Sequence, residues 1–143
     1  MLLFPKKPKY FKSFAGNKII NNYLKKHSTL RFSRIGLIAN ESGFIPNFQI
    51  ESIRIFLRRD LKKRARLFFS IFPNQPITKK PNEIRLGRGK GNFKYWTFYV
   101  KKNKILVELS GYNIKILTTA LLAIKYKLSI KSFIYNKHCR WIL

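Results

Sequence analysis

Residues 46–72 read PNFQIESIRIFLRRDLKKRARLFFSIF and join a stretch of helical spacing to a short apolar run. From Pro46 to Ala65 the apolar residues recur three and four positions apart, which predicts a helix with one packed side and other faces that are basic. The spaced apolar positions are Ile50, Ile53, Leu57 and Leu61. The run from Leu67 to Phe72 suits a buried strand, and Pro73-Asn74-Gln75-Pro76 closes it. This stretch therefore predicts a helix followed by a strand.

Further strands and one more helix flank this stretch. Residue types and spacing predict strands at 30–39, 93–100, 105–109 and 130–135, and a second helix at 113–127. Asn40, Ser42 and Gly43 mark a turn after the first strand, and Lys101-Lys102-Asn103-Lys104 suits a hairpin turn. The order predicts an α+β fold in which two helices pack on a mixed or antiparallel sheet.

The length suits a single domain with a basic arm before it. We place the arm at residues 1–28 and the domain at residues 29–143, with a long basic loop at 77–92 inside the domain. The arm lacks a steady hydrophobic period, so it would be extended and ordered mainly by its partner, and a solvated tail is the alternative. The arm cations expected to bind RNA are Lys6, Lys7, Lys9 and Lys12.

Charge is the strongest compositional signal. The chain has 31 Lys and Arg against five Asp and Glu, a net charge of +26 in 143 residues. Most cations therefore lack an internal partner, and the compact chain repels itself unless counterions or a polyanion neutralise them. Nucleic acid is the natural candidate, because each neutralised phosphate releases counterions. A solvated face is the usual explanation of a basic helix, but here we expect phosphate contacts from Arg54, Arg58, Arg59, Lys62 and Arg64.

Residues 85–92, RLGRGKGN, alternate glycine with cations. Glycine can use positive φ and admit another backbone at hydrogen-bonding distance, which applies to Gly87, Gly89 and Gly91. The nearby cations could act together on phosphate, and they are Lys79, Lys80, Arg85, Arg88 and Lys90. The spacing matches neither a dinucleotide fingerprint nor a Walker loop. A flexible solvated turn is the alternative, which the whole-chain charge disfavours.

Two aromatic residues follow the glycine-rich segment. Tyr95 and Trp96 point to opposite faces if their strand is regular. Either could stack on a base, and we expect at least one to belong to the core.

Several functional classes are disfavoured by what the sequence contains. Five scattered carboxylates, two histidines and the single Cys139 form no recognisable catalytic or metal-binding cluster, so we expect no enzyme, no metal and no cofactor. The most apolar stretch, 105–124, is broken by Glu108, Gly111, Asn113 and Lys115, so no uninterrupted apolar run approaches the roughly 18 to 20 residues of a membrane span. We do not expect a homo-oligomer.

Several motifs together resemble bacterial-type large-subunit ribosomal protein sixteen. Pro5-Lys6-Lys7-Pro8-Lys9-Tyr10 is similar to the family's Pro-Lys-Arg-x-Lys-Phe opening, so we expect no cleaved presequence. Phe32, Gly36-Leu37 and Ala39 resemble its Phe-Gly-x-x-Gly-Leu-x-Ala segment, and Gln49-Ile50-Glu51 with Arg54 resembles its Gln-Ile-Glu-x-x-Arg helix. The most specific similarity runs from Phe72 to Pro81, then through Arg85-Leu86-Gly87-Arg88-Gly89-Lys90-Gly91 to Tyr95-Trp96.

The chain also departs from the family pattern. The departures are Ser33, Pro46, Leu86 and Ser129, together with Asn113 and Ile114, which replace the acids that open the second helix. Missing acids would weaken the capping of that helix. None of these changes removes a cation from the central loop.

The resemblance implies a structural protein that folds on large-subunit rRNA near the peptidyl transferase centre, beside neighbouring ribosomal proteins. It also implies contact with A-site tRNA and entry late in subunit assembly. In that role the loop at 77–92 would reach the tRNA-binding cleft, while the arm and the first helix grip rRNA. A free-standing basic RNA-binding or RNA-chaperone factor with the same fold is the alternative.

Composition suggests a compartment. High Phe, Ile, Asn, Lys and Tyr content is what codons rich in A and T produce, which is typical of organellar genomes. We expect an organellar version of the family, in the mitochondrion first and a plastid second.

Overall fold

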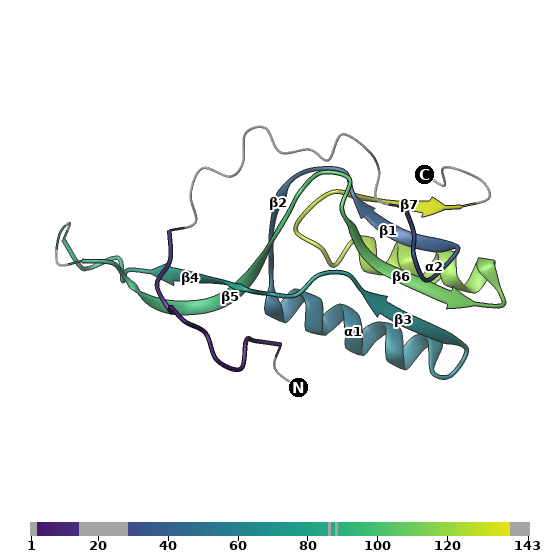
Figure 1. Cartoon of the computed structure of the whole chain (residues 1–143), viewed down its shortest axis with the longest axis horizontal. Helices are drawn as coiled ribbons and strands as arrows, with labels where there is room; N and C mark the ends of the chain where they lie inside the picture. Colours follow the sequence, from purple (N-terminus) through teal and green to yellow (C-terminus); the bar gives the residue numbers. More distant parts are fainter. Residues whose placement is uncertain (1–2, 15–28, 86, 88, 138–143) are drawn as a thin grey trace.

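The order of strands and helices along the chain builds two separate antiparallel sheets. The computed structural model describes residues 3–14, 29–85, 87 and 89–137, and in these it contains two helices and two sheets (Figure 1). The elements are β1 (Ile35–Ala39), β2 (Gly43–Pro46), α1 (Asn47–Leu61), β3 (Ala65–Phe69), β4 (Gln75–Lys79), β5 (Asn92–Val100), β6 (Ile105–Gly111), α2 (Ile114–Lys125) and β7 (Ser132–Asn136). The predicted α+β class with two helices is confirmed.

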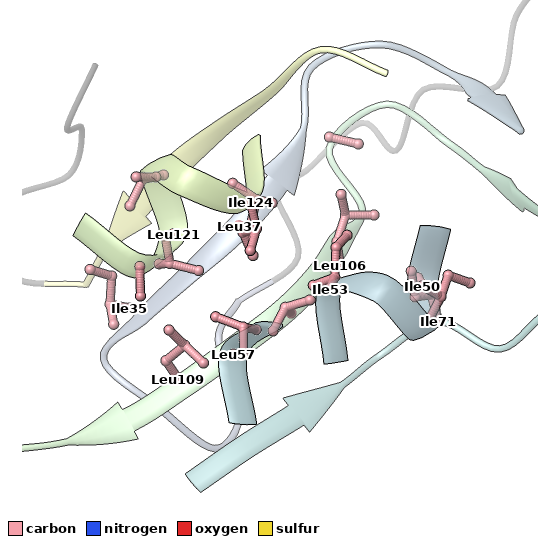
Figure 2. Close-up of a cluster of buried hydrophobic side chains, with 14 of the residues drawn as sticks. Ile35, Leu37, Ile50, Ile53, Leu57, Ile71, Leu106, Leu109, Leu121 and Ile124 are labelled. Atoms are coloured by element: carbon pink, nitrogen blue, oxygen red, sulfur yellow. The ribbon is translucent and has the colours of Figure 1, made fainter. Parts of the chain in front are cut away.

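The four-stranded sheet is the scaffold of the domain. Its order is β3, β6, β1, β7, and each neighbouring pair is antiparallel. Every residue of β1 is buried, because the strand is central and covered on both faces. One face forms the main core with both helices (Figure 2), and Ile35, Leu37, Leu57, Leu121 and Ile124 belong to it. The other face carries a smaller cluster of Leu30, Ile38 and Ile105.

The helix α1 is shorter than its predicted range. Leu61 is its last residue, and Lys62 turns the chain with a φ of 47° while its N–H donates to the Arg58 carbonyl at 3.0 Å. Residues from Ala65 onward leave the helix because they pair with β6, where Ala65 lies opposite Gly111. The predicted helix end at Ala65 was therefore wrong, since sheet pairing outweighs the local helical preference of residues 61–66, LKKRAR.

The helix α2 begins with a side-chain cap. Asn113 Oδ1 accepts a hydrogen bond from the Lys115 N–H at 3.0 Å, so one of the free donors at the helix start is satisfied. The first turn contains no acid. Asn113 thus supplies hydrogen bonding, although the charge that would favour the helix dipole is missing.

The three-stranded sheet contains two strands that the sequence did not predict. Its order is β2, β5, β4. Residues 43–46 had been expected in a turn and at a helix start, and residues 77–79 in a loop, yet both segments pair with β5. Pro76 within β4 obscures the strand signal, but an edge strand tolerates it. The expected loop at 77–92 is therefore the end of a β4–β5 hairpin, with residues 80–91 between its strands.

The turn at 101–104 does not close a hairpin. The two flanking strands, β5 and β6, belong to different sheets, so the turn is a corner between sheets and the hairpin prediction was wrong. Asn103 has a φ of 67°, and its N–H donates to the Ala39 carbonyl at 2.8 Å. Of the helices in the described ranges, neither has the length and apolar character to cross a membrane.

The first strand starts five residues later than predicted. Residues 30–34 do not join the sheet, and the backbone N–H groups of Arg31 and Phe32 donate to a buried carboxylate instead. Glu108 on β6 accepts the Phe32 N–H at 2.9 Å and the Arg31 N–H at 3.3 Å, and it is only 1% exposed. These bonds fix the segment before β1 against the sheet.

Candidate RNA interface

The tip of the β4–β5 hairpin needs its three glycines for two different reasons. Gly87 has a φ of 104° and Gly89 a φ of 79°, and residues that carry a Cβ rarely adopt these backbone angles. At Gly91 a Cβ would lie 2.6 Å from the Lys79 carbonyl carbon and 2.7 Å from the Lys80 nitrogen, so the strands could not approach as they do. The expected positive φ and close backbone approach are both confirmed. Arg88 and Leu86 lie outside the described residues.

The cations near the tip are held in different ways. Lys79 and Arg85 are exposed, whereas Lys80 is half-buried and its Nζ donates to the Gly87 carbonyl at 2.6 Å. Lys80 therefore closes the tip by bonding across it. Lys79 and Arg85 keep their charged ends on the surface, where a polyanion can reach them.

Lys90 ties the hairpin to the arm. Its Nζ donates to the Ser13 carbonyl at 2.5 Å and lies 4.1 Å from the centre of the Phe14 ring. In return, Lys12 Nζ donates to the Lys90 carbonyl at 3.3 Å. Lys90 is half-buried because the arm covers it, so it is less open to a phosphate than the exposed Lys79 and Arg85.

Aromatic contacts between the arm and the hairpin add to those of Lys90, and we call these contacts together the brace of the hairpin. The described part of the arm, residues 3–14, runs across β4 and β5 (Figure 1). The Phe11 ring centre lies 6.1 Å from that of Phe93 and 6.2 Å from that of Trp96. Trp96 is buried and confirms the expectation that at least one of the aromatic pair is in the core, while Tyr95 is half-buried against Phe48. The arm residues Lys6, Lys7, Lys9 and Lys12 remain exposed.

The cations of α1 gather at its C-terminal end, away from the hairpin tip (Figure 1). Arg58, Arg59 and Lys62 are exposed, and so is Arg64 just beyond the helix. Arg58 and Lys62 border a groove of about 440 Å³ between α1 and β3, together with Arg54 of α1 and with Arg66 of β3, which the sequence analysis did not single out. The C-terminal end of a helix carries a partial negative charge, which favours cationic side chains there.

Arg54 differs from its neighbours because it has an internal partner. Its Nε and Nη2 donate to the two carboxylate oxygens of Glu51 at 2.9 and 2.6 Å. The hydrogen bond from Arg54 lowers the pKa of Glu51. Because Glu51 already neutralises its charge, Arg54 should attract a phosphate less strongly than Arg58 or Arg59 does.

A second concavity lies at the end of the four-stranded sheet opposite the hairpin tip. It has a volume of about 960 Å³ and is bordered by residues from four separate parts of the chain. The cations around it are Arg31, Arg34, Lys63, Arg64, Arg66 and Lys137. Only Arg64 was predicted. Since the others come from loops and strand ends without a shared period, no local pattern in the sequence could have united them.

The comparisons with known proteins cover nearly the whole described domain. The family model for ribosomal protein L16p/L10e matches residues 5–135. The large ribosomal subunit protein uL16 of Exiguobacterium sibiricum is 37% identical over 130 residues, which cover 91% of this chain and 88% of that protein. Proteins of the same name from Sinorhizobium fredii and Rhizobium meliloti are each 37% identical over 131 residues, covering 92% of this chain and 94% of each relative.

Proposed function

Because the chain belongs to the ribosomal protein L16p/L10e family, we propose that its basic surfaces hold it in the large ribosomal subunit, as a structural constituent and not an enzyme. The observation that carries this conclusion is the family match from residue 5 to residue 135, which includes the arm, α1 and the hairpin together. A net charge of +26 supports it, since binding to rRNA would neutralise cations that lack internal partners.

In this proposal, rRNA is bound at two ends of the protein. The arm offers Lys6, Lys7, Lys9 and Lys12, and the end of α1 offers Arg58, Arg59, Lys62 and Arg64. Their exposure supports contact with phosphates. Such contacts fix position without reading sequence, so the shape of the folded rRNA would select the site.

The hairpin tip is the part that would approach the peptidyl transferase centre and the A-site tRNA. Support comes from its backbone, because no other atom lies within 4 Å of where a Cβ would stand at Gly87 or Gly89. A partner can therefore approach the backbone of the tip closely. Support also comes from the brace of Lys90 and Phe11, which holds the tip before any tRNA arrives. A preorganised tip loses less conformational freedom on binding. Folding of the arm onto rRNA and the hairpin would also suit late entry into the subunit.

Sedimentation tests the ribosomal assignment. Lysate from cells that express the tagged full chain is run through sucrose gradients at high salt, and the protein is measured against large-subunit rRNA. We expect co-migration at about one copy per subunit, because contacts distributed over two ends dissociate slowly. Release to the top of the gradient would support a free-standing RNA-binding factor instead.

Charge reversal tests the role of the tip. The double variant Lys79→Glu and Arg85→Glu removes two exposed cations but keeps Lys90 and its brace. Subunits carrying it should still assemble and should bind A-site tRNA about tenfold more weakly, the size expected for losing a charged contact. The matched control reverses Lys101 and Lys102, which are exposed at the corner between sheets. Equal tRNA binding by both variants would refute the proposed tip contact.

The compartment is proposed from composition and relatives. The relatives are bacterial proteins, which fits a bacterial-type ribosome such as organelles contain. The bias toward Phe and other residues of A- and T-rich codons supports an organellar gene, and we place the protein in the mitochondrion before a plastid. Fractionation of the organelles followed by detection of the protein with mitochondrial or plastid rRNA distinguishes the two.

A further inference from the structure

We propose that the concavity of about 960 Å³ beside β3 and β6 binds one unpaired nucleotide of rRNA, with Phe32 as the surface on which its base stacks. This inference rests on the proposed ribosomal function and adds a specific ligand. The start of β3 and the end of β6, which border the pocket, lie far from the hairpin tip in Figure 1, so the pocket is separate from the proposed tRNA contact.

Charge around the pocket identifies an anionic ligand. Six exposed cations border it, namely Arg31, Arg34, Lys63, Arg64, Arg66 and Lys137. No Asp or Glu is among the described residues that line it, and none of the six forms an ion pair within the described ranges. A single nucleotide and its flanking phosphates would bring several negative charges to these side chains at once.

Phe32 is held in place before any ligand arrives. Its N–H donates to Glu108 Oε2 at 2.9 Å, and Ser33 Oγ next to it donates to the Ile35 carbonyl at 2.8 Å. Its ring stacks on Phe68, with ring centres 5.0 Å apart and planes 21° from parallel. Despite this support, Phe32 is 59% exposed. A large apolar ring fixed at its backbone and left open to solvent is a platform ready for a partner.

The combination of a ring and cations favours an unpaired nucleotide over other anions. Double-stranded RNA presents phosphates and 2′-hydroxyls but keeps its bases stacked inside, so it has no use for an aromatic surface in a concavity. An acidic peptide would pair with the cations and leave Phe32 uncovered. An extruded base stacks on the ring while its flanking phosphates reach the arginines, which is how single-stranded RNA is commonly bound.

The floor of the pocket is also built for close packing. Gly111 lies at the end of β6, and a Cβ there would come within 2.9 Å of the Arg64 carbonyl. The strand β3 can therefore approach β6 closely, which brings Arg64 and Arg66 to the same rim as Arg31 and Arg34. The cations converge because of sheet pairing, and they do not depend on a flexible loop.

Binding of the full chain to two RNA hairpins tests the proposal. One hairpin carries a single unpaired 5-iodouridine. In the other, an added adenosine in the opposite strand pairs with the same 5-iodouridine, and the rest of the sequence is unchanged. Affinity is measured by anisotropy at about 0.3 M salt, where non-specific phosphate binding is weakened. We expect the bulged hairpin to bind about tenfold more tightly, as one base–aromatic stack predicts, and ultraviolet light to cross-link the iodouridine to Phe32.

Two leucine variants provide the matched comparison. Phe32 and Phe48 are each 59% exposed and each contacts one other aromatic ring, but Phe48 lies on α1 outside the pocket. Phe32→Leu should abolish the preference for the bulged hairpin, and Phe48→Leu should retain it. Both variants are first checked for unchanged circular dichroism and melting temperature.

Three outcomes have separate meanings. Equal affinity of the wild-type chain for the two hairpins, or a cross-link at another residue, would overturn the pocket while leaving the ribosomal assignment intact. Loss of the bulge preference in Phe48→Leu as well as in Phe32→Leu would show that the base does not stack specifically on Phe32 and would also overturn the pocket. Failure to co-sediment with large subunits would instead overturn the proposed function.

Discussion

Glu108 is the residue on which the segment before β1 depends. Its carboxylate is 1% exposed and accepts two backbone N–H groups, of Arg31 and Phe32, while the Ser33 hydroxyl, whose shorter hydrogen bond goes to the Ile35 carbonyl, lies 3.3 Å away. Glutamine has one acceptor oxygen and an amide donor of its own. In a Glu108→Gln variant the new donor would therefore face at least one of these groups, and a buried donor would lose its partner.

We predict that Glu108→Gln lowers the free energy of unfolding by about 1 to 3 kcal/mol, measured by urea denaturation. The control is Glu41→Gln. Glu41 accepts a single backbone N–H, from Lys131 at 2.7 Å, and an amide oxygen can accept that bond equally well. The control should change stability by less than about 0.5 kcal/mol, as surface substitutions usually do. Equal losses in the two variants would mean that burial of the Glu108 network is unimportant.

Glu51 gives a prediction that depends on pH. The hydrogen bond from Arg54 lowers its pKa below 4.5 in the folded state, so the pair stabilises the fold above pH 4.5 and this contribution is lost as pH falls through the folded value. Glu51→Gln should therefore be less stable than the wild type by about 0.5 kcal/mol at neutral pH. The gap should narrow as the pH is lowered and Glu51 becomes protonated, because a protonated carboxyl and an amide are both neutral. A gap of the same size at neutral and at acid pH would show that the ion pair is not its cause.

The hairpin and the arm form one unit at the scale of elements. Phe11 covers Trp96, which is 6% exposed, so removal of the Phe11 ring should open Trp96 to solvent. In a Trp141→Phe background, which leaves one tryptophan, Phe11→Ala should raise quenching of Trp96 fluorescence by acrylamide about twofold or more. Tyr10→Ala is the control, because Tyr10 is 66% exposed on the same arm. Identical quenching in both variants would mean that the arm does not pack on the hairpin in solution.

Local chemistry explains which elements the sequence could predict. The existence of α1, the central strands and the glycine-rich tip depends on spacing or on backbone freedom within a few residues and was predicted, although α1 ends earlier and β1 begins later than expected. The strand β4 could not be read, because Gln75 and Pro76 gain strand structure only by pairing with Thr97 and Trp96 of β5. The position of Lys90 also escaped prediction, since its partner Ser13 is 77 residues away.

The two cationic ends illustrate the same limit at the level of the site. The arm and loop lysines were predicted from runs of charge in the sequence. The pocket beside β3 and β6 brings Arg31, Arg66 and Lys137 together only because the strands pair in the order β3, β6, β1, β7. A binding surface assembled by sheet topology leaves no trace in local spacing.

At the scale of the whole molecule, the chain is a folded domain under strong self-repulsion. With 31 cations and five acids, most exposed charges in the free protein face others of the same sign. Salt weakens such repulsion, because the screening length falls to about 10 Å at 0.1 M and shortens further as salt is added. In the ribosome, rRNA would supply the same relief with far greater density of negative charge.

The free protein should therefore become more stable as salt is added, which is opposite to a protein stabilised by surface ion pairs. We predict that raising sodium chloride from about 20 to 300 mM increases the melting temperature by about 4 °C, equivalent to roughly 1 kcal/mol for a domain of this size. The Lys101→Glu and Lys102→Glu double variant, which reverses two exposed charges, should melt higher than the wild type at low salt and respond less to added salt. Differential scanning calorimetry measures both quantities. A melting temperature that falls with salt, or a double variant that melts lower at low salt, would show that internal ion pairs outweigh repulsion between the cations.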